Sequence, residues 1–331
     1  MNNSIPNTFG LKVKAKDFYE YSTVEELQAV LPRVRGQRWI HVGSGSNLLF
    51  THDYEGIVLH SRIVGVEEVK HDNQKVWLKA GAGVVWDDFV AYTVAHGLHG
   101  AENLSYIPGE VGASAVQNIG AYGVEAGDLI SEVHAVEVSS GKLRVFQADE
   151  CAYAYRSSVF KQALKERYVI THVVYALSRS FNPDLEYGAI RRELDSRGLS
   201  ASSLTGESLR QLVIDIRRSK LPDPKDLGSA GSFFMNPVVD RATFEALQRQ
   251  YPDMPHYDMP QGVKIPAGWM IEQCGWKGRA LGRAGVYDKQ ALVLVNLGGA
   301  TGEEILALSN AVRQSVKEKF GIGIHPEAII I

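Results

Sequence analysis

The sequence predicts an α+β fold, because strand-like and helix-like patterns alternate along its 331 residues without a regular repeat. Its length allows roughly two to three domains, each with its own core. Hydrophobic residues make up 45% of the chain and charged residues 22%, which are ordinary values for a soluble globular protein. We therefore expect a folded α+β protein of more than one domain.

The N-terminal half predicts the following elements in order. Ser22-Thr23-Val24-Glu25 has the pattern of a capping box, and it begins a short helix that carries Leu27, Val30 and Leu31. Strand-like runs lie at 39–42, 56–59 and 76–80, and Trp86, Phe89, Val90 and Val94 mark a helix that ends at Gly97. Residues 133–138 and 143–146 are expected to pair as a hairpin, and 168–177 to form a buried strand.

In the C-terminal half, Leu209, Leu212, Val213 and Ile216 form the apolar stripe of a helix, which Pro222 and Pro224 prevent from continuing. A small-residue segment follows at 228–234, then a helix at 266–274 and a strand at 291–297. A long helix begins with the capping box Thr301-Gly302-Glu303-Glu304 and ends at Gly321, and the chain closes with a strand that 325–327 interrupts. We place the main domain boundary between about residues 180 and 220.

Charge and cysteine content argue against several kinds of partner. The formal net charge of -3 gives no electrostatic reason to expect nucleic acid or an anionic membrane. Cys151 and Cys274 provide neither a disulfide framework nor a metal-ligand spacing, which fits a reducing compartment. The N-terminus lacks the pattern of a signal peptide, and no apolar run is long enough to span a bilayer. We expect a cytoplasmic protein; the oligomeric state stays open, with a monomer favoured.

The segment 108–123 is the most informative stretch of the sequence, because four of its sixteen residues are glycines. Glycine costs conformational entropy, so this density indicates backbone bends or a close approach to another group. A solvated linker would lack the Val111, Val116, Ile119 and Tyr122 found here. The segment predicts a backbone cradle for a large ligand that carries phosphate or polar ring edges. The alternative is a tight structural loop between buried strands.

A second glycine-rich loop, Gly43-Ser44-Gly45-Ser46-Asn47-Leu48, directly follows a strand-like run. Its successive backbone N–H groups are suited to an anion nest, and Ser44, Ser46 and Asn47 add side-chain donors. The dinucleotide pattern G-x-G-x-x-G fails at Leu48, and no helix pattern follows. The loop therefore predicts a pyrophosphate site that is not a Rossmann site. The sequence contains no Walker pattern, zinc C-x-x-C pair or H-E-x-x-H motif, and we predict no metal.

Three polar residues in separate segments are candidates for chemistry. Arg156 lies among aromatic and hydroxyl residues and offers a planar fork for carboxylate or phosphate, although a structural arginine is the alternative. Ser232 lies among small residues without a G-x-S-x-G elbow, and its alternative is a hydrogen-bonded loop residue. Glu327 follows a proline in an apolar strand, where a carboxylate is rarely buried unless it is paired; its alternative is an exposed turn residue.

Two further groups give weaker signals. Arg217, Arg218, Lys220 and Lys225 form either a pyrophosphate clamp or a solvated helix end. His96 and His99 have no carboxylate or cysteine companions in the pattern, so we interpret them as structural residues rather than metal ligands.

Taken together, these segments resemble the UDP-N-acetylenolpyruvoylglucosamine reductase family of bacterial flavoenzymes. The resemblance runs in order from about residue 10 to the end of the chain. The matching blocks are 43–49, 107–123, 155–161, 220–225, 228–237, 267–271, 290–293 and 326–327. Tyr187-Gly188 is similar to the substrate loop of the longer of the family's two subtypes.

The resemblance implies an FAD-binding region of the vanillyl-alcohol-oxidase-like type over residues 1–200, divided into two subdomains near 60–70, and a substrate-binding domain over 201–331. The last strand, about 322–331, is a candidate for a return to the flavin region. The resemblance also implies non-covalent FAD and NADPH as the hydride donor. The implied reaction reduces the enolpyruvyl group of UDP-N-acetylglucosamine-enolpyruvate to give UDP-N-acetylmuramate in peptidoglycan precursor synthesis.

By resemblance, the catalytic positions are Arg156, Ser232 and Glu327. The positions implied to bind FAD are Gly43, Ser44, Gly45, Ser46, Asn47, Leu48, Ile107, Pro108, Gly109, Gly112, Ala113, Ser114, Asn118, Gly120 and Ile170. The positions implied to contact the substrate are Tyr122, Tyr187, Lys220, Asn236 and Gln290. The chain departs from the family at Ser44, where a third glycine is common, and at Met235, where many relatives carry lysine.

The implied roles follow from the chemistry. Arg156 would stabilise the negative charge that develops at C2 and the carboxylate of the enolpyruvyl group. Ser232 would protonate C2, and Glu327 would be protonated or would orient Arg156 or a water. Two other functions stay open: a different FAD-dependent oxidoreductase of the same cofactor fold, and a non-catalytic nucleotide-sugar-binding protein.

Overall fold

A computed structural model describes residues 3–331, and the contacts within it divide the chain into two compact units. Unit 1 contains the described part of Met1–Ile5, Ala15–Ser44 and Glu55–Arg218. Unit 2 contains Pro6–Lys14, Gly45–Tyr54 and Ser219–Ile331. The glycine-rich loop 43–48 is thus divided between the units. The expected domain boundary near residue 200 stays a prediction.

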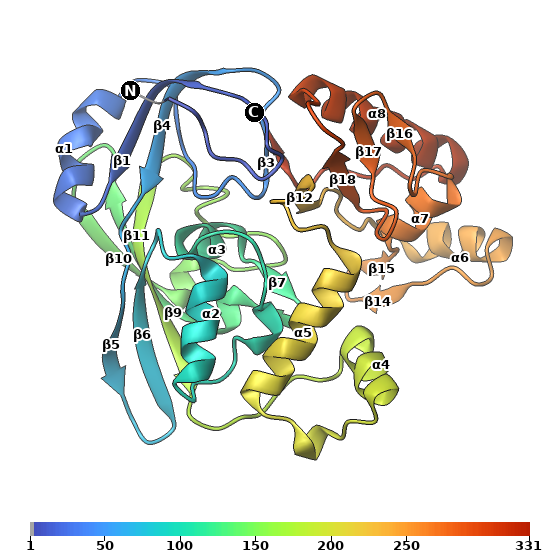
Figure 1. The fold of residues 1–331 in the computed structure, drawn as a ribbon, viewed down its shortest axis with the longest axis horizontal. Coiled ribbons are helices and arrows are strands. Elements are labelled where there is room, and N and C mark those ends of the chain that lie inside the picture. Colours follow the sequence, from blue (N-terminus) through green and yellow to red (C-terminus); the bar gives the residue numbers. More distant parts are fainter. Residues whose placement is uncertain (1–2) are drawn as a thin grey trace. The chain divides into compact units, whose positions relative to one another are not determined.

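The centre of unit 1 is a five-stranded antiparallel sheet (Figure 1). Its strands, in spatial order, are β10 (Leu143–Gln147), β9 (Ile130–Glu137), β11 (Tyr168–Ser178), β6 (Lys75–Gly81) and β5 (Val66–His71). Helices α2 (Trp86–Ala95) and α3 (Val111–Gln117) pack against one face. The core there contains Trp86 and Phe89, which lie three residues apart on one face of α2, and Tyr175 of β11, which points to the same side of the sheet; all three are buried.

A second layer covers the other face of this sheet. Strands β1 (Ala15–Tyr21), β4 (Tyr54–Ser61) and β2 (Trp39–His41) form a sheet with β2 parallel to β4, and helix α1 (Val24–Val34) packs against it. Val136 and Val169 lie in this core, whereas their neighbours Ala135 and Ile170 lie in the first. The cap of α1 is Thr23, which accepts from the Glu26 N–H, so the predicted box was placed one residue too early.

The rest of unit 1 is helical or short. Helices α4 (Gly188–Arg197) and α5 (Gly206–Lys220, whose last residues belong to unit 2) share a small apolar core. The short elements are η1 (Glu102–Leu104), β7 (Gly120–Ala121), β8 (Val124–Glu125), η2 (Ala126–Asp128), η3 (Ala148–Cys151) and η4 (Ala201–Ser203).

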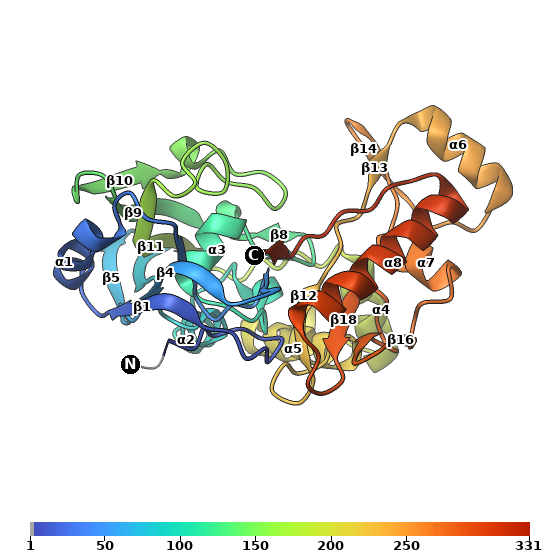
Figure 2. The ribbon, with the colours of Figure 1, turned by 90° about the horizontal axis from the view of Figure 1, so that it is seen from above.

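Unit 2 contains a four-stranded sheet in the order β12 (Gly228–Ser232), β18 (Val293–Asn296), β17 (Ala284–Val286) and β16 (Ala280–Leu281). Helix α8 (Gly302–Phe320) packs against this sheet and against α7 (Ala267–Gln273), as Figure 2 shows. A small sheet of β13 (Val238–Val239), β15 (Gly262–Lys264) and β14 (Tyr257–Met259) lies next to α6 (Arg241–Gln250). Strands β3 (Leu48–Leu49) and β19 (Ile329–Ile330) pair in parallel.

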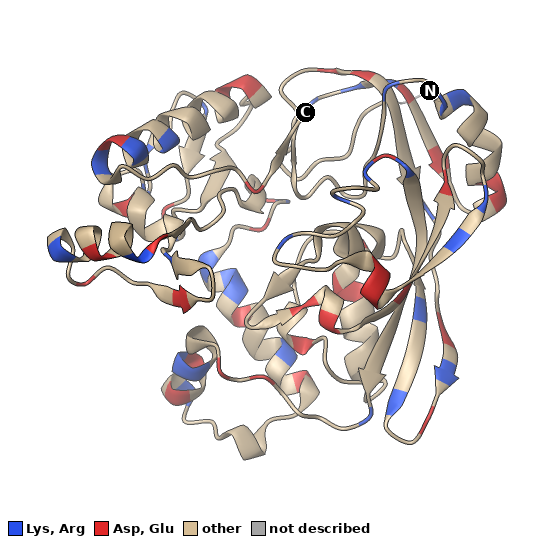
Figure 3. Cartoon of the chain, turned by 180° about the vertical axis from the view of Figure 1, so that it is seen from behind, with Lys and Arg blue, Asp and Glu red and all other residues tan. Residues whose placement is uncertain are grey.

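Acidic and basic residues are interspersed along the helices and strands (Figure 3). None of the helices in the described residues is both long and apolar enough to cross a membrane.

Candidate active site

Residues 111–125 of unit 1 form a short helix and a tight hairpin, not the continuous loop that the sequence predicted. Helix α3 ends at Asn118, whose φ of 49° is left-handed. Strands β7 and β8 then pair as Gly120↔Glu125 and Ala121↔Val124. Tyr122 and Gly123, both with positive φ, are therefore the two-residue tip of a hairpin. The predicted substrate residue Tyr122 is fixed at this tip.

Arg156 occupies a strained position in a four-residue turn. Ala154 and Ser157 exchange two backbone hydrogen bonds, of 3.1 and 2.9 Å, and Arg156 between them has a φ of 53°. A non-glycine residue in this conformation costs about 1–3 kcal/mol and persists only where its surroundings fix it. Arg156 Nη2 donates to the Gly120 carbonyl at 2.8 Å. The positive φ together with the bond to Gly120 therefore agrees with Arg156 as a candidate functional residue.

Asn103 joins the Tyr122 tip to the segment that carries Tyr187. Its buried side-chain amide donates to the carbonyls of Tyr122, at 2.8 Å, and Asp184, at 2.9 Å. The rings of Tyr122 and Tyr187 meet edge to face, with centroids 5.4 Å apart. Unit 1 thus brings together the two predicted substrate tyrosines, Tyr122 and Tyr187. Asn103 itself was not predicted, because an isolated asparagine leaves no local signal.

Arg217 lies beside Tyr122, and its Nε donates to the Tyr106 carbonyl at 2.9 Å. Burial raises the pKa of the Tyr122 phenol, and the Arg217 guanidinium acts against that rise. Burial also lowers the pKa of Arg217. Of the basic cluster seen in the sequence, Arg217 is therefore part of the tyrosine site rather than a solvated helix end.

The predicted FAD residues Ile107, Pro108 and Gly109 follow a turn anchored by Asp87. The Asp87 carboxylate accepts from the Tyr106 N–H at 2.5 Å and pairs with Arg210 at 2.6 Å. Burial opposes ionisation of Asp87, but Arg210 and the Tyr106 N–H hold its pKa below the usual value. This partly buried ion pair fixes the path of the chain into 107–109.

Inside and beside α3, several predicted FAD residues are already bonded within the protein. The Gly112 N–H donates to the Ala82 carbonyl at 2.9 Å, and a Cβ on Gly112 would lie 2.9 Å from that of Ala82. Ser114 Oγ bonds to the Val111 carbonyl at 2.7 Å and to the Tyr175 hydroxyl at 2.8 Å. Ala113 is exposed, and Ile170 is buried in β11. Contact of these residues with FAD stays a prediction.

The loop 43–48 leaves no room for side chains at its glycines. A Cβ on Gly43 would lie 2.9 Å from Glu110 Oε2, and one on Gly45 would lie 2.2 Å from the Pro6 carbonyl oxygen. Ser44 Oγ is buried and has no hydrogen-bond partner among the described residues. A buried hydroxyl without a partner is rare in a native fold and indicates a missing group. A tight glycine turn with such a hydroxyl fits the phosphates of a dinucleotide such as FAD.

Buried titratable groups that the sequence did not indicate lie beside Gly43. Burial raises the pKa of Glu110 to about 7. The Tyr21 hydroxyl is 2.7 Å from His41 Nε2, and His60 Nδ1 is 2.7 Å from the Val42 carbonyl. Burial, and then the neighbouring His60, lower the pKa of His41 to about 4, so the His41 imidazole is neutral near pH 7.

Unit 2 brings Ser232 and Glu327 onto neighbouring segments of backbone. Ser232 ends β12 after an irregularity at which Gly231 has a φ of 66°. The Glu327 N–H donates to the Phe233 carbonyl at 2.7 Å, and Phe234 and Pro326 form an antiparallel bridge. These two predicted catalytic residues, far apart in the sequence, are therefore close together. Arg156 belongs to unit 1.

The last strand joins the second part of the glycine-rich loop. Ile329 pairs with Leu48, and the Ile329 N–H donates to the Asn47 carbonyl at 2.9 Å. Glu327 therefore lies two residues before strand β19, which pairs with Leu48, a predicted FAD residue.

Two predicted substrate residues meet at the start of α7. Asn236 Oδ1 accepts from the Ala267 N–H at 2.9 Å, and a Cβ on Gly268 would lie 3.1 Å from Gln290 Oε1. Lys220 is the last residue of α5 and belongs to unit 2. The substrate residues thus form two groups, Tyr122 with Tyr187 in unit 1, and Asn236 with Gln290 in unit 2.

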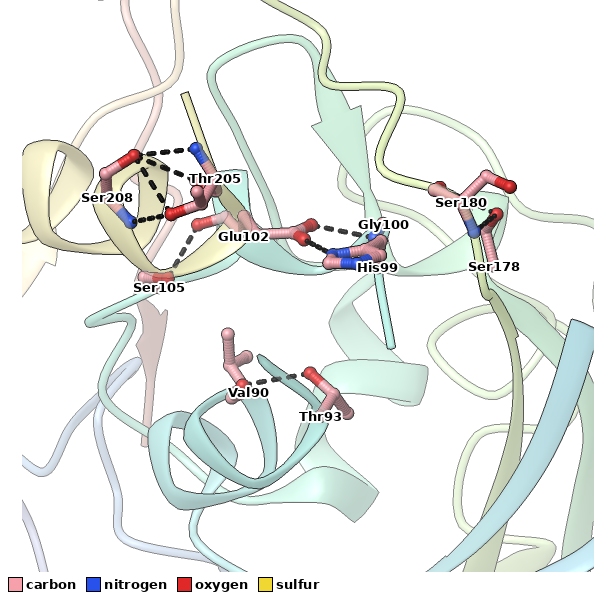
Figure 4. A network of polar contacts seen from close by, with 10 residues as sticks. All are labelled: Val90, Thr93, His99, Gly100, Glu102, Ser105, Ser178, Ser180, Thr205 and Ser208. Atoms are coloured by element: carbon pink, nitrogen blue, oxygen red, sulfur yellow. Dashed lines mark hydrogen bonds and ion pairs between the residues drawn. The ribbon is translucent and has the colours of Figure 1, made fainter. Parts of the chain in front are cut away.

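The histidine interpretation needs one correction. His99 does have a carboxylate companion, because its Nδ1 lies 2.8 Å from Glu102 Oε1, and the other Glu102 oxygen accepts from the Gly100 N–H at 2.7 Å (Figure 4). Gly206, the first residue of α5, packs on this pair. The His99–Glu102 pair therefore has a structural role, as the sequence interpretation stated, and packs against the start of α5. Within residues 3–331, no group of three or more His, Cys, Asp or Glu side chains is placed to hold a metal ion.

Comparisons with known proteins agree with this organisation. Residues 18–147 match the family model described as an FAD binding domain, and 223–331 match the C-terminal domain of UDP-N-acetylenolpyruvoylglucosamine reductase. Proteins named UDP-N-acetylenolpyruvoylglucosamine reductase are similar over nearly their whole length. The relative from Bacteroides fragilis is 55% identical over 98% of this chain and 97% of its own. That from Porphyromonas gingivalis is 48% identical over 97% and 95%.

A crystal structure of UDP-N-acetylenolpyruvylglucosamine reductase from Thermus caldophilus shares the fold, with a TM-score of 0.66 over 98% of this chain and 95% of that one, at 24% identity. The predicted α+β fold, with an FAD-binding region followed by a reductase domain, is confirmed, and so is FAD as the cofactor. The chain belongs to the UDP-N-acetylenolpyruvoylglucosamine reductase family of FAD-dependent oxidoreductases.

Proposed function

We propose that this protein uses NADPH to reduce the enolpyruvyl group of UDP-N-acetylglucosamine-enolpyruvate, giving UDP-N-acetylmuramate for peptidoglycan precursor synthesis. The observation that carries the proposal is the 55% identity, over 98% of the chain, to a relative named for this reductase activity. We place the protein in the cytoplasm, where it acts on a small UDP-sugar without a nucleic-acid or membrane partner; the oligomeric state stays open, with a monomer favoured.

FAD would be held by the loop 43–48 and by 107–120, where the close-packed glycines and the unused Ser44 hydroxyl support the assignment. When bound, FAD supplies the hydride transfer that links NADPH to the substrate. The chain's own residues position the reactants and stabilise the charge that develops.

Arg156 would stabilise the negative charge that forms at C2 and the carboxylate when C3 accepts a hydride. A guanidinium suits this task because it is always charged and its fork matches a carboxylate. Its strained turn and its bond to Gly120 support the role, since a preorganised cation needs no reorientation during the reaction.

Ser232 would donate a proton to C2. A serine is a weak acid, but an enolate-like carbanion is a strong base, so position matters more than acidity. The backbone bonds between Phe233 and Glu327 support a shared task for Ser232 and Glu327. Glu327 would be protonated, or would orient Arg156 or a water, because an ionised carboxylate would repel that of the substrate.

The substrate would contact Tyr122, Tyr187, Lys220, Asn236 and Gln290. The edge-to-face pair of Tyr122 and Tyr187 supports a shared aromatic contact from unit 1. The position of Asn236 and Gln290 at the start of α7 supports a polar contact from unit 2. Lys220 would pair with the diphosphate as a point charge.

A spectral titration of the purified protein tests the proposal. Flavin absorbance should decrease when NADPH is added without oxygen, and it should return when enolpyruvyl-UDP-N-acetylglucosamine follows. A flavin that only oxygen reoxidises would indicate an oxidase. A colourless protein that binds the nucleotide sugar would indicate a binding protein, and either result rejects the reductase assignment.

A further inference from the structure

We propose that Lys161 and Asn118 are positioning residues for Arg156, which hold its strained turn against the end of helix α3. The inference rests on the proposed function, because the arginine that they hold is the one assigned to stabilise charge on the substrate. Neither residue needs to touch the substrate for this task.

Lys161 joins the turn to the helix. Its Nζ donates to the Arg156 carbonyl at 3.1 Å and to Gln117 Oε1 at 2.8 Å. Gln117 is the last residue of α3. One ammonium group therefore fixes the carbonyl of the strained residue to a rigid element.

Asn118, the residue after Gln117, makes a second connection between the turn and the end of α3. Its buried Nδ2 donates to the Ala154 carbonyl at 2.9 Å and to Glu125 Oε2 at 2.7 Å, and its Oδ1 accepts from the Gly127 N–H at 2.8 Å. The turn that contains Arg156 and the hairpin that contains Gly120 are thus tied to one amide. A fully bonded buried amide of this kind rigidifies its surroundings.

The guanidinium itself rests on the same segment. Arg156 Nη2 donates to the Gly120 carbonyl, and Nη1 lies 2.9 Å from where a Gly120 Cβ would stand. Both the backbone and the head group of Arg156 are therefore held by residues 117–120. Loosening Lys161 should let the head group move without removing any atom that is predicted to bind a ligand, whereas Asn118 is itself a predicted FAD position.

Two variants remove these bonds with little other change. Lys161→Met keeps the aliphatic stem, and Asn118→Gly keeps the left-handed backbone, which glycine adopts freely. We expect each to slow reoxidation of the flavin by the enolpyruvyl substrate roughly ten- to a hundredfold, because small displacements of a catalytic group are costly. In Lys161→Met, FAD content and the rate of flavin reduction by NADPH should stay at the wild-type level. Asn118 is itself a predicted FAD position, so the reoxidation rate of Asn118→Gly is compared per bound flavin. Lys165→Met, at an exposed lysine of the same segment, is the matched control and should change neither rate.

A double-mutant cycle identifies the route of the effect. If Lys161 acts through Arg156, Lys161→Met should cause no further loss in an Arg156→Ala background. Additive losses, or a loss of FAD and thermal stability in step with the rate, would overturn the proposal. If the wild-type protein itself fails to react with the enolpyruvyl substrate, the proposed function fails. A normal wild-type reaction with unaffected variants would reject the positioning role alone.

Discussion

Replacing Glu110 with Gln should change how folding stability depends on pH. Glu110 is 8% exposed, and its carboxyl lies beside the tight turn at Gly43. Burial raises its pKa from 4.5 to about 7, an effect that Arg62 only partly offsets. Because the folded pKa lies above the unfolded one, the folded state binds the proton more tightly. Its contribution to stability is complete below about pH 4.5 and is lost as the pH rises through 7.

The size of this effect follows from the two pKa values. The difference between 4.5 and about 7 corresponds to roughly 3 kcal/mol between the protonated and ionised limits. For a cooperative unit of this size, that amounts to roughly 6–12 °C in Tm. The neutral amide of Gln keeps the shape of the protonated acid and has no proton to lose in this range.

The assay is the Tm of the FAD-free wild type and of Glu110→Gln between pH 4.5 and 8.5. At pH 4.5 the Tm values of the two proteins should differ little, and at pH 8.5 the variant should melt several degrees higher. His41 and His60, whose pKa values burial lowers, weaken the fold as the pH falls, but they affect both proteins alike. Glu55→Gln, at an exposed carboxylate, is the control. A difference in Tm that does not change with pH would refute the reasoning.

The same carboxyl should also affect FAD. Glu110 Oε2 lies 2.9 Å from the position of a Gly43 Cβ, so an ionised carboxylate stands beside the predicted pyrophosphate turn. If that turn binds the pyrophosphate, the FAD affinity of the wild type should fall as the pH rises through 7. The FAD affinity of Glu110→Gln should stay constant over the same pH range. Equal pH profiles for the two proteins in a fluorescence titration would place the pyrophosphate elsewhere.

Three further predictions concern flavin content, the two half-reactions and substrate binding. Gly45→Ala should lose both stability and FAD, because its Cβ would meet the Pro6 backbone at 2.2 Å. Gly120→Ala, at another predicted FAD position, should lose flavin and also slow substrate reduction, because its Cβ would stand 2.9 Å from Arg156 Nη1; full flavin retention in both variants would contradict this. Ser232→Ala should leave flavin reduction by NADPH near wild type and slow reoxidation by the substrate about 10²–10⁴-fold in stopped flow, with partial recovery in Ser232→Cys; equal slowing of both steps would make Ser232 structural. Lys220→Ala should weaken binding of the sugar nucleotide roughly ten- to a hundredfold in calorimetry, and an unchanged Kd would reject its diphosphate contact.

Elements with strong local signals were predicted well. Helix α8 has the capping box of Thr301 and Glu304 and ends at Gly321, as the sequence indicated. The hairpin of β9 and β10 and the buried strand β11 are also confirmed. They could be predicted because their apolar residues recur with the period of a strand. Each of these elements carries its own start, stop and buried face in consecutive residues.

Elements whose stability comes from distant contacts were missed. Strand β5 is exposed at nearly every position and exists through its pairing with β6, so no apolar pattern marks it. Helix α3 is short and contains Gly112, and it forms because that glycine packs against Ala82. The sequence therefore indicated a ligand loop where a helix and a hairpin stand.

The candidate site shows the same division. Arg156, Ser232 and Glu327 were assigned from the resemblance to the family, because the residues around them match its blocks, and their catalytic roles stay predictions. The groups that hold them could not, since the bonds of Asn118 to Ala154 and of Lys161 to Gln117 join separate segments. Glu110 and Asn103 depend in the same way on which buried surfaces the fold brings together.

The central claim, reduction of an enolpyruvyl nucleotide sugar, is tested most directly by one anaerobic turnover. Protein whose flavin has been reduced with one equivalent of NADPH is mixed with enolpyruvyl-UDP-N-acetylglucosamine, and the products are analysed by mass spectrometry. We predict one UDP-N-acetylmuramate for each flavin reoxidised, heavier than the substrate by one hydride and one proton. Unchanged substrate beside flavin that stays reduced until oxygen enters would contradict the claim.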